Sequence, residues 1–86
     1  MVYQEIRIWK KIGSDMAVRY FCLLDISSGK YRVQSADFFR LPVTAEQVKF
    51  FESQAAELFI ETSSAGVDDW HVTIEKAIEM HEKNFS

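Results

Sequence analysis

The segment RYFCLL, from Arg19 to Leu24, constrains the fold more than any other part of the chain. After Arg19 it would place apolar side chains on both faces of a strand. A strand with one solvent-facing side alternates apolar and polar residues with a period of two. The segment therefore raises the question of what covers its second face.

The first half of the chain predicts three strands. Residues 2–12, 16–26 and 31–39 have β-type patterns, and short turn sequences, GSD and SSGK, separate them. In the first strand the even-numbered positions carry Ile6 and Ile8, so we expect the even-numbered face to point to the core. Connections this short predict an antiparallel meander with the RYFCLL strand in the middle.

The second half predicts two helices. Thr44 is an N-cap candidate, because Gln47 follows three residues later as in a capping box and Val43 and Val48 occupy the staple positions. This helix should end near Thr62. Its apolar stripe is Val48, Phe51, Ala55, Leu58 and Phe59.

The second predicted helix starts with Asp68 or Asp69 as its N-cap. Its apolar positions recur at helical spacing, which predicts one buried side. They are Trp70, Ile74, Ala77, Ile78, His81 and Phe85.

The element order β-β-β-α-α predicts an α+β fold in a single domain, residues 1–86. The fold class expected is a two-layer sandwich, in which the three-stranded meander packs its even-numbered face against both C-terminal helices. Two helices can cover only one face of three strands. The odd-numbered face is therefore expected to remain open.

This open face is the predicted partner-binding site. Aromatic side chains and arginine are typical anchors of protein interfaces. The partner-binding residues expected there are Tyr3, Arg7, Trp9, Arg19, Phe21 and Arg32. One face of the third strand, with Arg32, Gln34 and Phe38, should join it. The function predicted is a non-catalytic protein-interaction or regulatory domain whose partner is another protein or a second copy in a homodimer.

Two alternatives remain open for the same face. Phe21 and Leu23 are explained equally well as side chains tucked under a loop or a terminus. The aromatic residues with Arg7, Lys11 and Arg32 also suit weak binding of single-stranded nucleic acid by stacking.

The charge distribution argues against the nucleic-acid alternative. Residues 1–40 hold seven Lys or Arg and four acids, which gives +3. Residues 41–86 hold three Lys and nine acids, which gives −6, so the halves sum to the net charge of −3. Phosphate attraction dominates nucleic-acid binding, and the acidic half opposes it. A preference of helices for Glu explains the same asymmetry without any partner.

No catalytic, metal or cofactor site is predicted. Asp68–His71 (DDWH) has metal-ligand residue types, but the chain supplies no third and fourth ligand at a suitable spacing. His81 lies on the apolar stripe and is expected at the edge of the core. Cys22 belongs to the even-numbered, core-facing set and is expected to pack as a small apolar residue. We therefore expect that the protein is not an enzyme.

The chain is expected to be cytoplasmic. It has no apolar run of about 18 residues and no secretion signal at its start, so no membrane partner is predicted. Its one cysteine cannot form an internal disulfide, as is common in a reducing compartment. Phe50 lies opposite the apolar stripe of the first helix and is expected to be exposed, either as a docking anchor or as an isolated surface residue.

Overall fold

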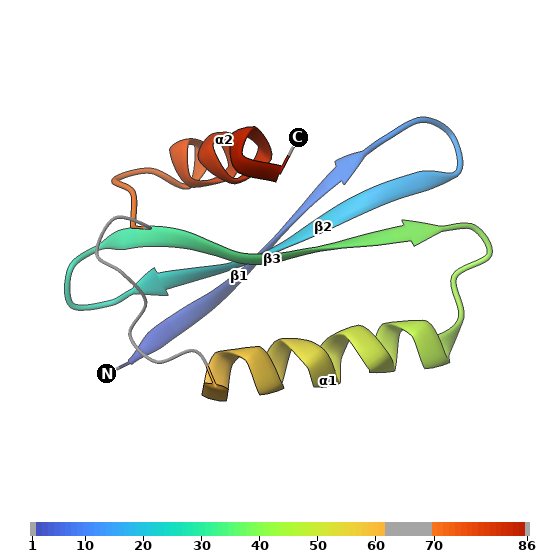
Figure 1. Ribbon diagram of the computed structural model, residues 1–86, viewed down its shortest axis with the longest axis horizontal. Helices are drawn as coiled ribbons and strands as arrows, with labels where there is room; N and C mark the ends of the chain where they lie inside the picture. The colour runs from blue at the N-terminus through green and yellow to red at the C-terminus, as the bar shows by residue number, and fades with distance from the viewer. Residues whose placement is uncertain (1, 62–69, 86) are drawn as a thin grey trace.

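The computed structural model describes residues 2–61 and 70–85 of the chain (Figure 1). Three strands are followed by two helices, which confirms the predicted α+β order. The elements are β1 (Tyr3–Lys11), β2 (Met16–Asp25), β3 (Lys30–Arg40), α1 (Ala45–Glu61) and α2 (Ile74–Phe85).

The sheet is the predicted antiparallel meander, with β2 between β1 and β3. Both hairpin turns contain a glycine with a positive φ, 84° at Gly13 and 72° at Gly29, a conformation that other residues seldom adopt. The N–H of Gly29 donates to the carbonyl of Asp25 at 2.8 Å. The two glycine-containing turns therefore determine where β1 and β2 end and where β2 and β3 begin.

A β-bulge in β3 changes which of its side chains share a face. The pairing skips one residue, Gln34, opposite the step from Phe21 to Cys22. Before the bulge, Arg32 is opposite Leu23, and after it Phe38 is opposite Val18. The prediction that Arg32 and Phe38 lie on one face is therefore wrong, because the extra residue reverses the alternation.

The two helices lie on opposite faces of the sheet (Figure 1), so the prediction of two layers with one open face is wrong. Ile74 and Ile78 of α2 pack on the even-numbered face, and Ala55 of α1 packs with Phe21 and Leu23 on the other. The physical reason is that β2 is apolar on both faces. Each helix therefore removes one apolar surface of β2 from water.

The helix starts show one correct and one incorrect prediction. The Oγ1 of Thr44 accepts the N–H of Gln47 at 3.1 Å, which confirms the cap of α1. The cap of α2 is Thr73, whose Oγ1 accepts the N–H of Lys76 at 3.1 Å. Asp68 and Asp69, predicted for that role, lie outside the described residues.

Trp70, predicted on the apolar stripe of the second helix, precedes α2 and stacks on Tyr3 with ring centres 5.6 Å apart. It belongs to the core under α1, whereas Ala77 and Ile78 belong to the side of α2. The helical spacing of Trp70 and Ile74 is therefore accidental.

The core between the sheet and α2 is mostly apolar, and its central residues are fully or almost fully buried. Val18 is 2% exposed and Cys22 is fully buried. Burial raises the pKa of the Cys22 thiol to about 11, so the sulfur stays protonated at neutral pH. The prediction that Cys22 packs as a small apolar residue is confirmed.

Candidate functional site

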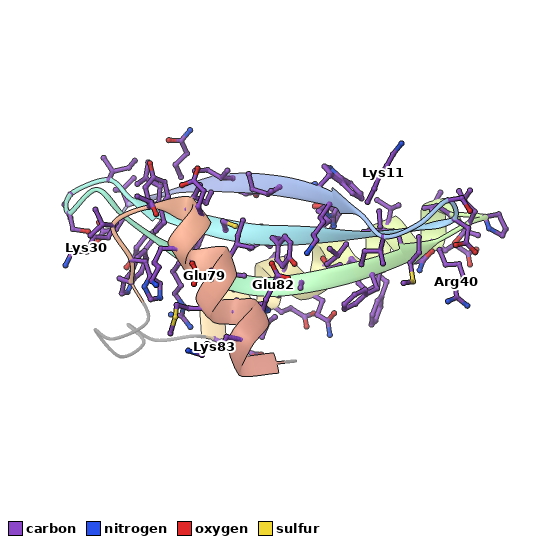
Figure 2. All side chains as sticks on the ribbon, turned by 90° about the horizontal axis from the view of Figure 1, so that it is seen from above. Lys11, Lys30, Arg40, Glu79, Glu82 and Lys83 are labelled. Atoms are coloured by element: carbon purple, nitrogen blue, oxygen red, sulfur yellow. The ribbon has the colours of Figure 1, made fainter. Side chains whose placement is uncertain are left out.

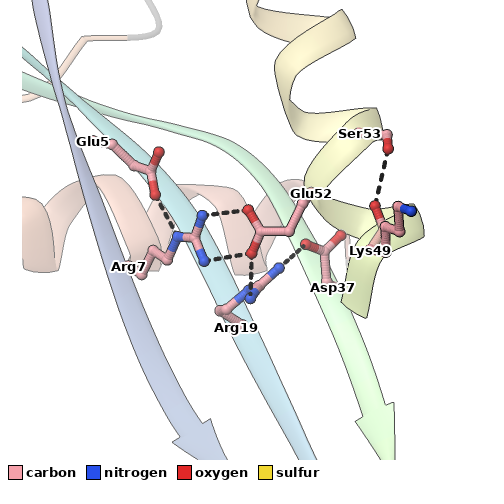
Figure 3. Close-up of polar contacts among 7 residues, drawn as sticks. All are labelled: Glu5, Arg7, Arg19, Asp37, Lys49, Glu52 and Ser53. Atoms are coloured by element: carbon pink, nitrogen blue, oxygen red, sulfur yellow. Dashed lines mark hydrogen bonds and ion pairs between the residues drawn. The ribbon is translucent and has the colours of Figure 1, made fainter. Parts of the chain in front are cut away.

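A buried arginine lies at the centre of the sheet face covered by α1. Arg19, in the middle strand, is only 5% exposed. Its guanidinium contacts two carboxylates (Figure 3): Nη1 lies 3.2 Å from Oε1 of Glu52, and Nη2 lies 3.5 Å from Oδ2 of Asp37. Asp37 comes from β3 and Glu52 from α1, so one cation joins three elements of the fold.

Glu52 also receives a second arginine. Arg7 of β1 donates to both carboxylate oxygens of Glu52 at 2.5 Å and also pairs with Glu5 (Figure 3). The hydrogen bonds from Arg7 hold the pKa of Glu52 below its ordinary value, so Glu52 remains ionised in mildly acidic solution. This bidentate geometry fixes α1 above β1 and β2.

Asp37 has the opposite electrostatic setting. Burial raises its pKa above the ordinary value, although the hydrogen bond and charge of Arg19 oppose that shift. The attraction between Asp37 and Arg19 must therefore offset the cost of removing the Asp37 carboxylate from water.

Aromatic rings cover the other side of the same guanidinium. The Cζ of Arg19 lies 5.0 Å from the ring centre of Phe39 and 5.5 Å from that of Trp9, distances typical of cation–π contacts. The rings of Trp9 and Phe39 are 5.3 Å apart, and Phe51 of α1 meets Phe39 edge-on at 5.0 Å. The guanidinium of Arg19 therefore contacts both a pair of carboxylates, Asp37 and Glu52, and a pair of aromatic rings, Trp9 and Phe39.

An apolar cavity of about 310 Å³ opens beside these rings, and we call it the Trp9 groove. The β1–β2 turn, the β3–α1 connection and the first turn of α1 enclose it. The lining residues are Trp9, Lys11, Gly13, Ser14, Asp15, Met16, Ala17, Arg19, Phe39, Leu41, Val43 and Val48.

Two local contacts shape the wall of the Trp9 groove. The N–H of Leu41 donates to the carbonyl of Asp15 at 2.9 Å, which ties the β3–α1 connection to the first hairpin turn. Thr44 then starts α1 directly beyond Val43. These contacts present the side chains of Leu41, Val43 and Trp9 to solvent, with Trp9 57% exposed.

The guanidinium of Arg19, beside the groove, has one unsatisfied donor. Its Nε is buried and has no hydrogen-bond partner in the described part of the chain. A buried donor without an acceptor is rare and costly, so the position of Arg19 adds to the electrostatic cost of this face.

The six residues predicted to bind a partner fall into three places. Arg7, Trp9 and Arg19 come together at the groove and its ion pairs. Tyr3 and Phe21 lie in the core under α1, where Tyr3 also meets Phe59 edge-on at 5.8 Å. Arg32 is half-buried on β3, before the bulge.

Sequence reasoning missed other residues of the site: Asp37, Phe39, Leu41, Val43 and Glu52. Phe39 and Asp37 follow the bulge, so alternation counted from the start of β3 gives them the wrong face. The signal for Glu52 was present in the sequence, as an acid on an acidic helix next to a basic sheet.

The opposite net charges of the two halves of the chain allow ion pairs between strands and helices of the same molecule. Arg7 pairs with Glu52 of α1, and the Nζ of Lys10 lies 3.0 Å from Oε2 of Glu82 on α2. Strand cations therefore meet helix carboxylates on both faces of the sheet, and the basic sheet lies between two acidic helices (Figure 1).

The other residues considered in the sequence, His71, His81 and Phe50, make contacts that belong to the fold. His71 exchanges backbone hydrogen bonds with Tyr31 at 2.7 Å, and the ring of His81 lies edge-on to Tyr20 at 6.2 Å. Phe50 is exposed, as predicted, and lies against Phe51. Within residues 2–61 and 70–85, no three His, Cys, Asp or Glu side chains are grouped to hold a metal ion.

Comparison with known proteins gives no further assignment, because no family model, curated protein or solved structure matches the chain. Among the described residues, neither helix is long and apolar enough to span a membrane. The function is therefore argued from the geometry of the site.

Proposed function

We propose that this protein is a non-catalytic protein-interaction domain that binds one bulky apolar side chain of a protein partner in the Trp9 groove. The observation that carries this proposal is the exposed indole of Trp9 above a buried cation at the mouth of an apolar cavity. Trp and Arg are the residues most often found at energetic centres of protein interfaces.

The size of the groove supports a side chain as its occupant. A volume of about 310 Å³ is at the lower end of the range for small-molecule pockets. It suits one or two bulky side chains better than a whole cofactor. The lining is apolar apart from a few polar groups, and the exposed side chains of Leu41 and Val43 extend it on one side.

The Nε of Arg19 lacks an acceptor but is shielded from solvent, so a ligand in the groove does not reach it without rearrangement. The exposed indole of Trp9 instead favours a protein partner over an apolar small molecule, because Trp is a typical anchor of protein interfaces.

The nucleic-acid alternative has less support from the geometry. Arg7 and Arg19 are already paired with carboxylates, and α1 lies on the sheet face where bases were expected to stack. A fluorescent single-stranded oligonucleotide tests this alternative directly. Binding that weakens steeply with salt would favour it over the peptide.

A random peptide library displayed on phage tests the proposed function. The selection is made on the wild type and on Trp9→Ala, and Phe38→Ala serves as the matched control. Phe38 is also 57% exposed but lies on the opposite face of the sheet.

We expect recovered peptides to share one bulky apolar anchor. Trp9→Ala should weaken their binding by roughly thirtyfold, as expected for a central aromatic anchor. Phe38→Ala should change their affinity by less than about twofold, since an exposed residue outside the interface contributes little. Peptides that bind the wild type and Trp9→Ala equally would overturn the proposal, as would a selection that yields none.

A further inference from the structure

The first strand is the least covered element of the sheet. None of the nine residues of β1 is buried, whereas the centre of β2 is buried on both faces. The helices lie nearest to β3, and the view from above shows β1 as a long outer edge of the sheet (Figure 2). An edge strand of this length presents a row of backbone groups that another strand can pair with.

The hydrogen-bond pattern shows which groups of β1 point outward. The N–H of Ile12 donates to the carbonyl of Met16, and the N–H of Ile26 donates to the carbonyl of Val2. In an antiparallel pair the bonded residues alternate, so the even-numbered residues of β1 bond to β2. The odd-numbered residues, from Tyr3 to Lys11, direct their N–H and C=O groups away from β2.

The opposite edge of the sheet is less suited to pairing. Tyr31 of β3 already exchanges two backbone hydrogen bonds with His71. The bulge at Gln34 interrupts the strand shortly afterwards. The pairing of β1 with β2, in contrast, runs without a break over all nine residues of β1.

We propose that the free edge of β1 pairs antiparallel with β1 of a second copy, around a two-fold axis at Ile6, to form a continuous six-stranded sheet. This axis places Glu5 opposite Arg7 of the second copy and Arg7 opposite its Glu5. It also places Tyr3 opposite Trp9, and Ile6 opposite itself. Opposite charges and aromatic pairs stabilise such cross-strand neighbours, and the cross-axis charges add to the ion pairs that Arg7 makes with Glu5 and Glu52 in its own chain.

Neighbouring registers are less favourable. A two-fold axis must pass through a residue, because opposed side chains share a face. An axis at Arg7 places two arginines directly opposite each other, which is repulsive. An axis at Ile8 also makes an opposite-charge pair, Glu5 with Lys11, but it places Lys10 opposite Ile6 and loses the aromatic pair of Tyr3 with Trp9. The self-complementary order Tyr3-Glu5-Arg7-Trp9 therefore selects the second copy as the partner and Ile6 as the axis.

The pairing has a modest expected strength. Seven paired residues span about 23 Å, and side chains on both faces give the contact a depth of about 10 Å, or roughly 230 Å² of projected area per copy. Stable interfaces bury roughly 1,200 Å² or more in total. We therefore expect a weak, concentration-dependent dimer in the class of transient contacts.

This inference goes beyond the proposed function and rests on the backbone edge of β1; of the residues that line the Trp9 groove, Trp9 and Lys11 belong to that strand. Analytical ultracentrifugation between about 10 μM and 1 mM tests it with two charge variants. Glu5→Arg creates Arg–Arg pairs across the axis, and Arg7→Glu creates Glu–Glu pairs. Glu52→Gln accompanies Arg7→Glu, so that the introduced carboxylate does not face the carboxylate of Glu52 within its own chain.

We expect each variant alone to dimerise at least about tenfold more weakly than the wild type, because each like-charge pair occurs twice. An equimolar mixture should form a heterodimer, because every cross-axis pair is then opposite in charge. Circular dichroism checks that both variants are folded. A monomeric wild type at 1 mM, variants that dimerise unchanged, or a mixture that stays monomeric would each overturn the proposal.

A second variant tests the backbone contact itself. Glu5→Pro removes an N–H that points away from β2, so the sheet of the monomer keeps its hydrogen bonds. It should weaken dimerisation more than Glu5→Ala does. Equal dimerisation by the two folded variants would contradict pairing through this edge.

Discussion

The two faces of the sheet are covered by similar helices but held by different forces. The face under α2 is a continuous apolar core of Val18, Tyr20 and Cys22 with Ile74 and Ile78. Its strand-to-helix ion pair, Lys10 with Glu82, lies at the exposed rim. The face under α1 instead has a buried arginine at its centre.

The difference shows what each face is suited to do. On the α2 side, apolar packing encloses Cys22, which is fully buried, and the cavity on this face, about 280 Å³, has two charged side chains, Lys10 and Glu82, in its lining. On the α1 side, Arg19 requires carboxylates on one side and aromatic rings on the other, so the helix cannot close over the whole face. Among the described residues, two cavities remain on this face, one of about 340 Å³ between Phe21 and Phe59 and the other the Trp9 groove, where we propose that the partner binds.

The largest predicted effect is the loss of stability when a substitution breaks the buried ion pair on the α1 side. Asp37→Ala should lower the free energy of unfolding by about 3 kcal/mol, because it leaves Arg19 buried beside only the partly exposed Glu52. Replacing both partners, Arg19→Met with Asp37→Leu, should return stability to within about 1 kcal/mol of the wild type. Urea unfolding measures both values. A loss below about 1 kcal/mol for Asp37→Ala would show that the pair is not structurally important.

An intermediate effect compares the ion pairs that join each helix to the sheet. Glu52→Gln should cost about 1 kcal/mol, because it removes partners of both Arg7 and Arg19. Glu82→Gln on the other face should cost clearly less, since its pair with Lys10 is exposed. Urea unfolding at low salt and at about 1 M salt measures the difference, and salt should reduce both losses. Equal losses would remove the distinction between the two faces.

The smallest predicted effect is a pH dependence on the α2 side. Burial lowers the pKa of His81 below its ordinary 6.5, against the opposing charge of Glu82. The unfolded chain therefore binds more protons than the folded one just below pH 6.5, so stability should fall as the pH falls through this region. Unfolding at about pH 7.5 and about pH 5.5 measures this slope, and His81→Phe should reduce it. An unchanged slope in the variant would assign the dependence to other groups.

The sequence alone determined the local structure. The strand patterns of the first half, glycines at the hairpin turns and the Thr44 cap each act over a few neighbouring residues, and the structure shows all of them. These features need no knowledge of distant contacts. The apolar character of RYFCLL raised the question of what covers the second face of the middle strand, but the prediction that this face stays open was wrong.

Only the tertiary structure decided which helix covers which face. Both helices have an apolar side that fits either face, so their placement depends on the total surface buried and not on local pattern. The bulge at Gln34 likewise reverses the later part of β3 and brings Asp37 and Phe39 to Arg19. The site is assembled from contacts far apart in the chain, and for that reason alternation and spacing could not locate it.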